Sequence, residues 1–271
     1  MRGLQTPVRA IRRQVFTEVA KLGFKANAET LVADMEAIPY EIVGEDSEVK
    51  YRESIYRARA VVRERLRLAM GLSLRPENKP VHLTAGVEAS NISEKYYEPP
   101  LMQVIPSGCE SCEENKYEVS NVCKGCLAHP CQEVCPRGAI SMVNGKSFID
   151  QDKCIKCGKC KSVCPYDAIA KKERPCKKAC GVNAITSDKL GRAYIDADKC
   201  VSCGMCMVSC PFGAISDKSQ IFQLARALSE GEEIVAEVAP AFVGQFGPNI
   251  NVRNFKAALE ELGFSETYEV A

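Results

Sequence analysis

The 271-residue chain contains no long apolar run and almost no net charge. No stretch approaches the roughly 18 consecutive apolar residues of a membrane helix, so we expect no membrane association. The N-terminus has no apolar h-region of a secretory signal, so we expect a cytoplasmic protein rather than a secreted disulfide scaffold. The 36 Lys and Arg residues nearly balance 35 Asp and Glu residues, which leaves a formal charge of +1.

Cysteine, in contrast, is abundant, with 16 residues. Twelve of them form three runs that each end in Cys-Pro: Cys123/Cys126/Cys131/Cys135, Cys154/Cys157/Cys160/Cys164 and Cys200/Cys203/Cys206/Cys210. The second and third runs have the C-x2-C-x2-C-x3-C-P spacing of bacterial ferredoxins, in which three close thiolates bind one [4Fe-4S] cube and the fourth binds its neighbour. The spacing therefore predicts paired iron-sulfur clusters.

Zinc and disulfides are the alternative uses of these cysteines. Zinc sites usually combine two short Cys or Cys/His pairs that lie a dozen or more residues apart. Disulfide scaffolds are usually short and secreted. The close runs favour iron-sulfur clusters, and hence a reducing compartment, over both.

Repeats within the chain indicate how many clusters it holds. The tail after a last cysteine recurs four times, as CPRGAI, CPYDAI, CGVNAI and CPFGAI, and SFIDQDKC (147–154) matches AYIDADKC (193–200). The repeats predict two tandem ferredoxin-like modules of two clusters each, at about 116–170 and 171–217, built from pseudo-symmetric halves.

One half-motif is incomplete. Cys176-x3-Cys180 lacks a preceding C-x2-C pair, while Cys109-x2-Cys112 lies upstream without a partner motif. Joining the two accounts for all 16 cysteines as four sets of four. Alternatively, Cys109 and Cys112 form a separate zinc or redox pair.

The exchange of the fourth ligand between neighbouring cubes assigns the sets. We predict cluster 1 at Cys123, Cys126, Cys131 and Cys164; cluster 2 at Cys154, Cys157, Cys160 and Cys135; cluster 3 at Cys200, Cys203, Cys206 and Cys180; and cluster 4 at Cys109, Cys112, Cys176 and Cys210. Since these sets need no further ligand, we predict that His129 is an ordinary loop residue. His82 is expected at the surface or in packing.

Four clusters change the charge balance. Each cube with its thiolates carries about −2, so the loaded chain is expected near −7, which disfavours nucleic-acid binding. Two basic tracts remain. Residues 51–70 read as an amphipathic helix capped by Gly71, with Tyr51 on its apolar face and arginines on another; these are either a solvated face or a docking stripe for an acidic redox partner. The tract of Lys171, Lys172, Arg174, Lys177 and Lys178 is either an offset to cluster charge or a solvated linker.

Hydrophobic periodicity predicts an α+β protein. Residues 1–70 are expected to be helical, with one helix ended by Gly23 and another stopped by Pro39. Residues 71–108, with five prolines, are expected to be an irregular linker. The tandem ferredoxin-like domain spans 109–217. Residues 218–271 predict a helix capped by Ser219 and then one βαβ unit, too small to stand alone, so we expect an incomplete α/β domain.

Three segments carry a family resemblance: NVCKGCLAHPCQEVCPRGAI, EEIVAEVAPAFVGQFG and NFKAALEELGFSETYEVA. With the four-cluster pattern, they resemble the monomeric [FeFe] hydrogenases of anaerobic bacteria, where the ferredoxin modules join the catalytic domain. That family holds its catalytic H-cluster in motifs such as TSCCP, MPCxxK and CxxGC, and none of these occurs here. The resemblance implies a chain truncated just inside the catalytic domain.

We therefore expect an electron-transfer segment between a soluble ferredoxin-like donor and a catalytic domain that this chain lacks. No catalytic residue is assigned. One alternative is a stand-alone polyferredoxin or electron-transfer subunit of another anaerobic oxidoreductase. A cluster-bearing regulatory or sensory protein is a third possibility, disfavoured because sensing does not require four clusters.

Overall fold

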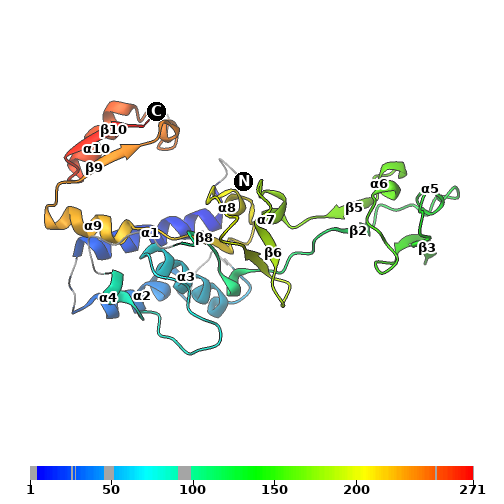
Figure 1. Cartoon of the computed structure of the whole chain (residues 1–271), viewed down its shortest axis with the longest axis horizontal. Helices are drawn as coiled ribbons and strands as arrows, with labels where there is room; N and C mark the ends of the chain where they lie inside the picture. Colours follow the sequence, from blue (N-terminus) through cyan, green and yellow to red (C-terminus); the bar gives the residue numbers. More distant parts are fainter. Residues whose placement is uncertain are drawn as a thin grey trace. The chain divides into compact units, whose positions relative to one another are not determined.

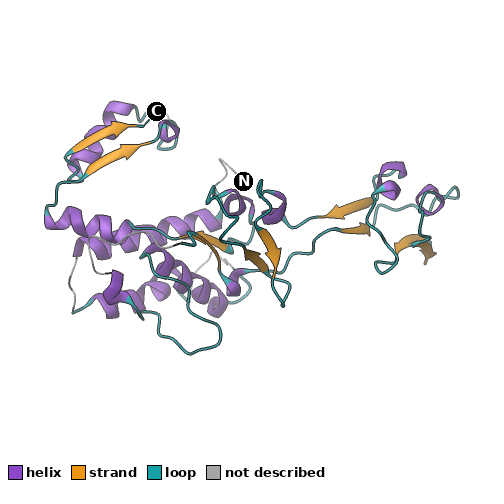
Figure 2. Cartoon of the chain, in the orientation of Figure 1, coloured by secondary structure: helices purple, strands orange, loops and turns teal. Residues whose placement is uncertain are grey.

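The computed structural model describes residues 5–25, 27, 29–45, 52–90, 99–247 and 249–270. The fold is α+β, with helices and small two-stranded sheets (Figure 1, Figure 2). It divides into two compact units, one formed by Met1–Gly108 with Phe212–Ala271 and the other by Cys109–Pro211. Among the described residues, no helix is both long and apolar enough to cross a membrane.

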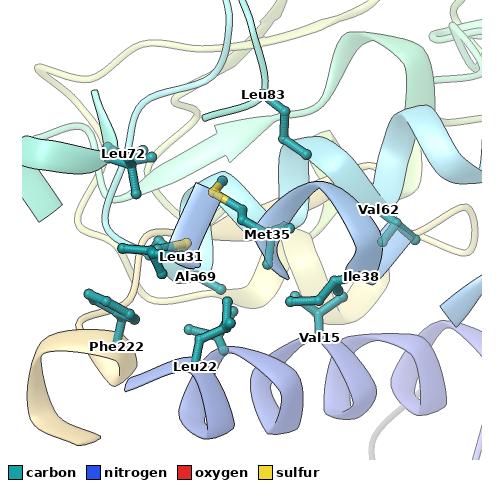
Figure 3. Packing of buried hydrophobic residues seen from close by; sticks show 14 of the residues in the cluster. Val15, Leu22, Leu31, Met35, Ile38, Val62, Ala69, Leu72, Leu83 and Phe222 are labelled. Carbon is teal, nitrogen blue, oxygen red and sulfur yellow. The ribbon is translucent and has the colours of Figure 1, made fainter. Parts of the chain in front are cut away.

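The first unit has a helical core. Its main helices are α1 (Pro7–Lys25), α2 (Leu31–Ile42), α3 (Ile55–Ala69) and α9 (Ile221–Glu230). Apolar residues three and four positions apart give each helix one buried face. Figure 3 shows these faces meeting, with Val15 and Leu22 opposite Ile38 and with Phe222 completing one end. The predicted helical stripe of α1 is confirmed by the burial of Ile11, Val15, Val19 and Leu22.

Two predicted helix ends are wrong. α1 continues past Gly23, which serves instead as a close-approach point, because a Cβ there would lie 2.6 Å from the Cβ of Ala225 on α9. α2 continues through Pro39 to Ile42, and the N–H of Val43 donates to the carbonyl of Pro39. Proline removes one donor but leaves its own carbonyl available, so tertiary burial of α2 carries the helix one turn further.

The predicted helix 51–70 is observed as α3, and Gly71 at φ +76° follows its C-terminus as expected. Tyr51 lies outside the described residues. The arginines of α3 hold loops in place. Arg59 donates to the carbonyl of Val43, and the buried Arg67 donates to the carbonyls of Ser73, Leu83 and Ala85. These contacts favour a packing role over both a solvated face and a docking stripe.

Short elements complete this unit. Residues 71–108 contain α4 (Val87–Ser90), β1 (Met102–Val104) and the 3-10 helix η1 (Pro106–Gly108). β1 pairs antiparallel with β8 (Ile215–Asp217). Ser219 does not occupy the N-cap of α9, which is Gln220, but its hydroxyl accepts from the N–H of Ile221.

The C-terminal segment is a βαβ unit, as predicted. Its elements are β9 (Val235–Val238), the 3-10 helix η2 (Pro240–Phe242), α10 (Val252–Glu261) and β10 (Glu266–Glu269). β9 and β10 pair in parallel, with Val235 opposite Glu266. Asn251 caps α10 by accepting from the N–H of Asn254.

The second unit consists of short strands, tight loops and single-turn helices. Its helices are α5 (Pro130–Glu133), α6 (Lys159–Val163), α7 (Pro175–Lys178) and α8 (Met205–Ser209). Its strands are β2 (Lys116–Val119), β3 (Ile140–Val143), β4 (Lys146–Ile149), β5 (Ile169–Lys172), β6 (Ile185–Ser187) and β7 (Ala193–Ile195). β2 pairs with β5, β3 with β4 and β6 with β7, all antiparallel.

Along the chain, these strand pairs are nested. The β2–β5 pair encloses the β3–β4 hairpin and the first two cysteine runs. The β1–β8 pair encloses this whole segment, together with Cys109, Cys112, the β6–β7 hairpin and the third run. The first ferredoxin-like half-pairs therefore interrupt the chain between Cys112 and Cys176.

Candidate iron-sulfur sites

Two cavities in the second unit are each lined by four cysteines. Cys123, Cys126, Cys131 and Cys164 line the first, with about 320 Å³ of empty space including its opening. Cys135, Cys154, Cys157 and Cys160 line the second, with about 330 Å³. Each set takes three cysteines from one run and the fourth from the other. These are the sets named above for clusters 1 and 2.

The thiols of Cys109, Cys112, Cys176 and Cys210 form a third group. The charges of Cys210 and Cys109 both raise the pKa of Cys112, after the larger effect of burial, and both also act on Cys176. For the remaining set, Cys200 and Cys203 act on the pKa of Cys206 in the same way. Cys180 lies at the end of α7, and no such interaction joins it to Cys206 among the described contacts.

A recurring backbone hydrogen bond marks the last cysteine of three half-motifs. The N–H of the alanine four residues later donates to the sulfur, from Ala139 to Cys135 at 3.3 Å, from Ala168 to Cys164 at 3.4 Å and from Ala184 to Cys180 at 3.2 Å. Such donors stabilise thiolate charge and tune iron-sulfur sites. Cys180 thus has the same local environment as two cysteines that line the cavities.

The orphan cysteine Cys109 also has a counterpart. Ser147 and Ala193 open the two copies of the repeated phrase. The N–H of Ser147 bonds to the sulfur of Cys123, and the N–H of Ala193 donates to the sulfur of Cys109 at 3.4 Å. Cys109 therefore occupies in the second half of the site the position that Cys123 occupies in the first.

Sequence reasoning missed the role of two residues near these thiols. Ser147, whose hydroxyl lies 3.3 Å from the sulfur of Cys131, stands where the other copy of the phrase has alanine, and that difference was the available signal. Arg174 is only 4% exposed. Its guanidinium donates to the carbonyl of Cys112 at 3.0 Å and to that of Gly191 at 2.7 Å. Arg174 also lowers the pKa of Cys112 and Cys176, against the larger effect of burial.

The rest of the basic tract around Arg174 is paired at the surface. Lys171 and Lys178 both bind Glu173, and Lys177 binds Glu114 at 2.9 Å. Lysine contacts lower the pKa of Glu173 to about 2. The tract is thus neither bare nor a solvated linker, and only its arginine is buried near the thiols.

The two histidines stay away from the first two cavities. His129 caps α5 in the left-handed conformation, with φ 41°, and it is not among the residues that line either cavity. His82 is exposed. The prediction that neither histidine is a ligand is consistent with these positions.

The donor sets suit a group larger than one ion. All 16 cysteines are free of disulfides. Within the described part of the chain, no three His, Cys, Asp or Glu side chains are close enough to share a single metal ion. Four thiols around a cavity, with backbone N–H groups aimed at the sulfurs, fit a [4Fe-4S] cube better than a tetrahedral zinc ion.

Comparison with known proteins agrees with this chemistry. Residues 148–170 and 193–216 match the family described as "4Fe-4S binding domain". The chain is 38% identical over 65 residues to an uncharacterized ferredoxin of Methanocaldococcus jannaschii, covering 24% of this chain and 39% of the relative. It is 43% identical over 56 residues to the electron transport protein HydN of Escherichia coli, covering 21% and 32%.

A third relative belongs to an ion-translocating oxidoreductase complex of Methanosarcina acetivorans. This protein is 41% identical over 63 residues, covering 22% of this chain and 24% of the relative. The alignments thus span well under two thirds of the length of these relatives. They establish that the chain contains ferredoxin-like, iron-sulfur 4Fe-4S binding segments, similar to those of electron-transport proteins.

Proposed function

We propose that the chain binds four [4Fe-4S] clusters in the four cysteine sets assigned above. The observation that carries this proposal is the shared N–H to sulfur contact of Ser147 with Cys123 and of Ala193 with Cys109. It supports a ligand role for the orphan pair, without which only three sets of four remain. A bound [4Fe-4S] cube takes up and releases single electrons, and the chain's residues supply thiolates and N–H donors that need little rearrangement for either charge state.

We also propose that the first two-cluster module is inserted into the second. In this arrangement, cluster 4 draws on cysteines before and after the insertion, which accounts for the separation of Cys112 from Cys176. The division into a helical region 1–70, a connecting segment 71–108, a ferredoxin-like region 109–217 and an α/β segment of hydrogenase type 218–271 is part of the same proposal.

The function that this organisation supports best is an electron relay of an [FeFe]-hydrogenase-like system. The relay would carry electrons between a soluble donor such as a ferredoxin and an H-cluster domain outside these 271 residues. Support comes from the resemblance of the C-terminal segment and from its parallel βαβ unit. A relative named as an electron transport protein points to the same general role.

The competing function is an electron-transfer subunit of another oxidoreductase. The relative from an ion-translocating oxidoreductase complex favours it, because that protein also carries ferredoxin-like segments within a larger assembly. A chain of this kind would pass electrons to a partner with no H-cluster.

The direct test is anaerobic reconstitution of the full chain with iron and sulfide. We expect about 16 Fe and about 16 sulfide per chain, and reduction by about four electrons at low potential. About 12 Fe with one tightly bound zinc would refute the cluster role of Cys109 and Cys112. To separate the two functions, the loaded chain is mixed with an H-cluster catalytic domain. Hydrogen evolution that depends on the chain supports the hydrogenase relay, and its absence favours the other oxidoreductase.

Gly125 is expected to be essential for the first site. A Cβ at this position, where φ is +58°, would lie 2.1 Å from the carbonyl oxygen of Gly145. Since Gly125 also lines the first cavity, Gly125→Ala should remove one cluster, about a quarter of the iron. Gly138→Ala is the matched control, because Gly138 has φ +56° but no atom within 4 Å of the added Cβ.

Gly138→Ala should keep the full iron content and cost only the left-handed strain of about 1–2 kcal/mol. Iron analysis and thermal unfolding of both variants check this prediction. Equal iron in the two variants would contradict it.

Acid should remove iron from the four sites unequally. Burial raises the pKa of Cys176 to about 12, whereas the N–H of Ser147 lowers the pKa of Cys123. A thiol must lose its proton to bind iron, so a raised pKa lets protons compete at a higher pH. On lowering the pH from 8 in the presence of an iron chelator, the site containing Cys176 should therefore lose iron before the site containing Cys123. Electron paramagnetic resonance of samples taken along the titration checks the order, and simultaneous loss would contradict it.

A further inference from the structure

Two loops of the second unit expose a cysteine of the candidate sites. Cys157 and Cys203 are the exposed members of the 16, and they occupy equivalent positions in the second and third runs. Each is followed by a glycine in the left-handed region, Gly158 at φ 81° and Gly204 at φ 74°. Because the two loops share one backbone conformation, their side chains can be compared position by position.

The loops differ mainly in charge. The segment 150–161 reads DQDKCIKCGKCK and has four lysines against two aspartates, whereas 196–207 reads DADKCVSCGMCM and has one lysine against two aspartates. Three lysines account for the difference, and we call them the lysine trio: Lys156, Lys159 and Lys161. The third run has Ser202, Met205 and Met207 at these positions.

The lysine trio lies directly at the second candidate site. Lys156 and Lys159 line the same cavity as Cys157, and all three lysines are exposed. None of them forms an ion pair with a carboxylate of the described residues, in contrast to Lys153, which binds Asp150 at 3.5 Å. Lys159 is also the first residue of α6 (Figure 1), where the helix dipole disfavours a cation. Helix stability therefore does not explain a lysine at this position.

Overall charge makes the location of this patch important. With four clusters the chain would carry about −7, which repels an acidic protein at most approaches. A local cluster of free lysines beside an exposed thiolate then selects one approach, because complementary charge steers encounter and fixes orientation. The exposed Ile155 adds an apolar contact at the same loop.

We propose that the lysine trio is the docking surface for an acidic, reduced iron-sulfur or flavin electron carrier, and that electrons enter the chain at cluster 2. In the docked complex the carrier loses one electron and the cluster held by Cys135, Cys154, Cys157 and Cys160 gains it, with no bond or proton exchanged. The exposed Cys203 loop, which lacks these lysines, does not attract such a carrier. This inference rests on the proposed four-cluster relay.

The test exchanges the lysine trio for the residues that the chain itself uses at the equivalent positions, Lys156→Ser, Lys159→Met and Lys161→Met. The reconstituted full chain is reduced in a stopped-flow instrument by an acidic 2[4Fe-4S] ferredoxin. The wild-type rate should fall steeply with salt. The variant should be at least about tenfold slower at low salt and nearly independent of salt.

Three controls isolate docking. Lys25→Gln, Lys79→Gln and Lys189→Gln together remove the same charge from exposed positions elsewhere and should change the rate less than about twofold. A second trio variant, with glutamine at all three positions, keeps side-chain length if the first folds poorly. A neutral reduced deazaflavin radical measures electron uptake without charge steering and should respond far less to the trio.

The outcomes separate the two levels of the proposal. Failure of the wild-type chain to bind iron and sulfide would refute the proposed function itself. Full iron content with an unchanged ferredoxin rate in both trio variants would overturn the docking surface alone. Equal slowing by ferredoxin and by the deazaflavin radical would also overturn it, because the lysines would then act on the cluster potential.

Discussion

Cys176→Ala and Cys180→Ala are expected to destroy two different iron-sulfur centres, although the two residues lie one helical turn apart on either end of α7. The sulfur of Cys176 is grouped with those of Cys109 and Cys210, whereas Cys180 matches Cys135 and Cys164 in its N–H contact. Each variant should retain about 12 of about 16 iron atoms. Electron paramagnetic resonance of the reduced protein should show different signals missing in the two variants.

Further cysteine variants identify the partners of each residue. Cys109→Ala should remove the same signal as Cys176→Ala, and Cys203→Ala the same signal as Cys180→Ala. Val182→Ala, at an exposed position two residues beyond Cys180, serves as the local control and should keep all the iron. If Cys176→Ala and Cys180→Ala removed one common signal, the assignment of clusters 3 and 4 would be wrong, while that of clusters 1 and 2 would stand.

Arg174→Ala is expected to destabilise the second unit by about 3 kcal/mol. The variant leaves the buried carbonyls of Cys112 and Gly191 without their donor, and it removes the contact at 3.1 Å to the hydroxyl of Ser187. Chemical denaturation of the reconstituted protein measures the loss. Arg137→Ala is the control, since Arg137 is exposed and should change stability by less than about 0.5 kcal/mol.

The same substitution should lower one reduction potential. A positive charge near the thiolates of Cys112 and Cys176 favours the more negative, reduced state of the centre they hold, so its removal should lower that potential by on the order of 60 mV, or about 1.4 kcal/mol for one electron. Arg174→Lys keeps the charge but not the planar fork of donors, and it should lose stability while largely retaining the potential. A potential unchanged in Arg174→Ala would show that the arginine has only a structural role.

The cysteine spacing alone determined the chemistry of this protein. Three thiolates within seven residues suit only a few metal groups, and that constraint is local, so the clusters could be predicted without any tertiary information. The repeated phrases extended the prediction, because aligned copies of one motif imply one local geometry. The helices around Val15 and Val62 and the C-terminal parallel βαβ unit followed from hydrophobic periodicity for the same reason.

Only the tertiary structure decided which groups support the sites. Gly23 looked like a helix end, but its role depends on α9, some 200 residues away, which needs a surface without a Cβ. Arg174 looked like part of a surface tract because its neighbours are lysines, yet its partners are carbonyls from other segments. The link from Cys109 to Ala193 and the nesting of strand pairs likewise join residues far apart in sequence. Local patterns carry no record of such contacts, since they arise from how the segments pack against each other.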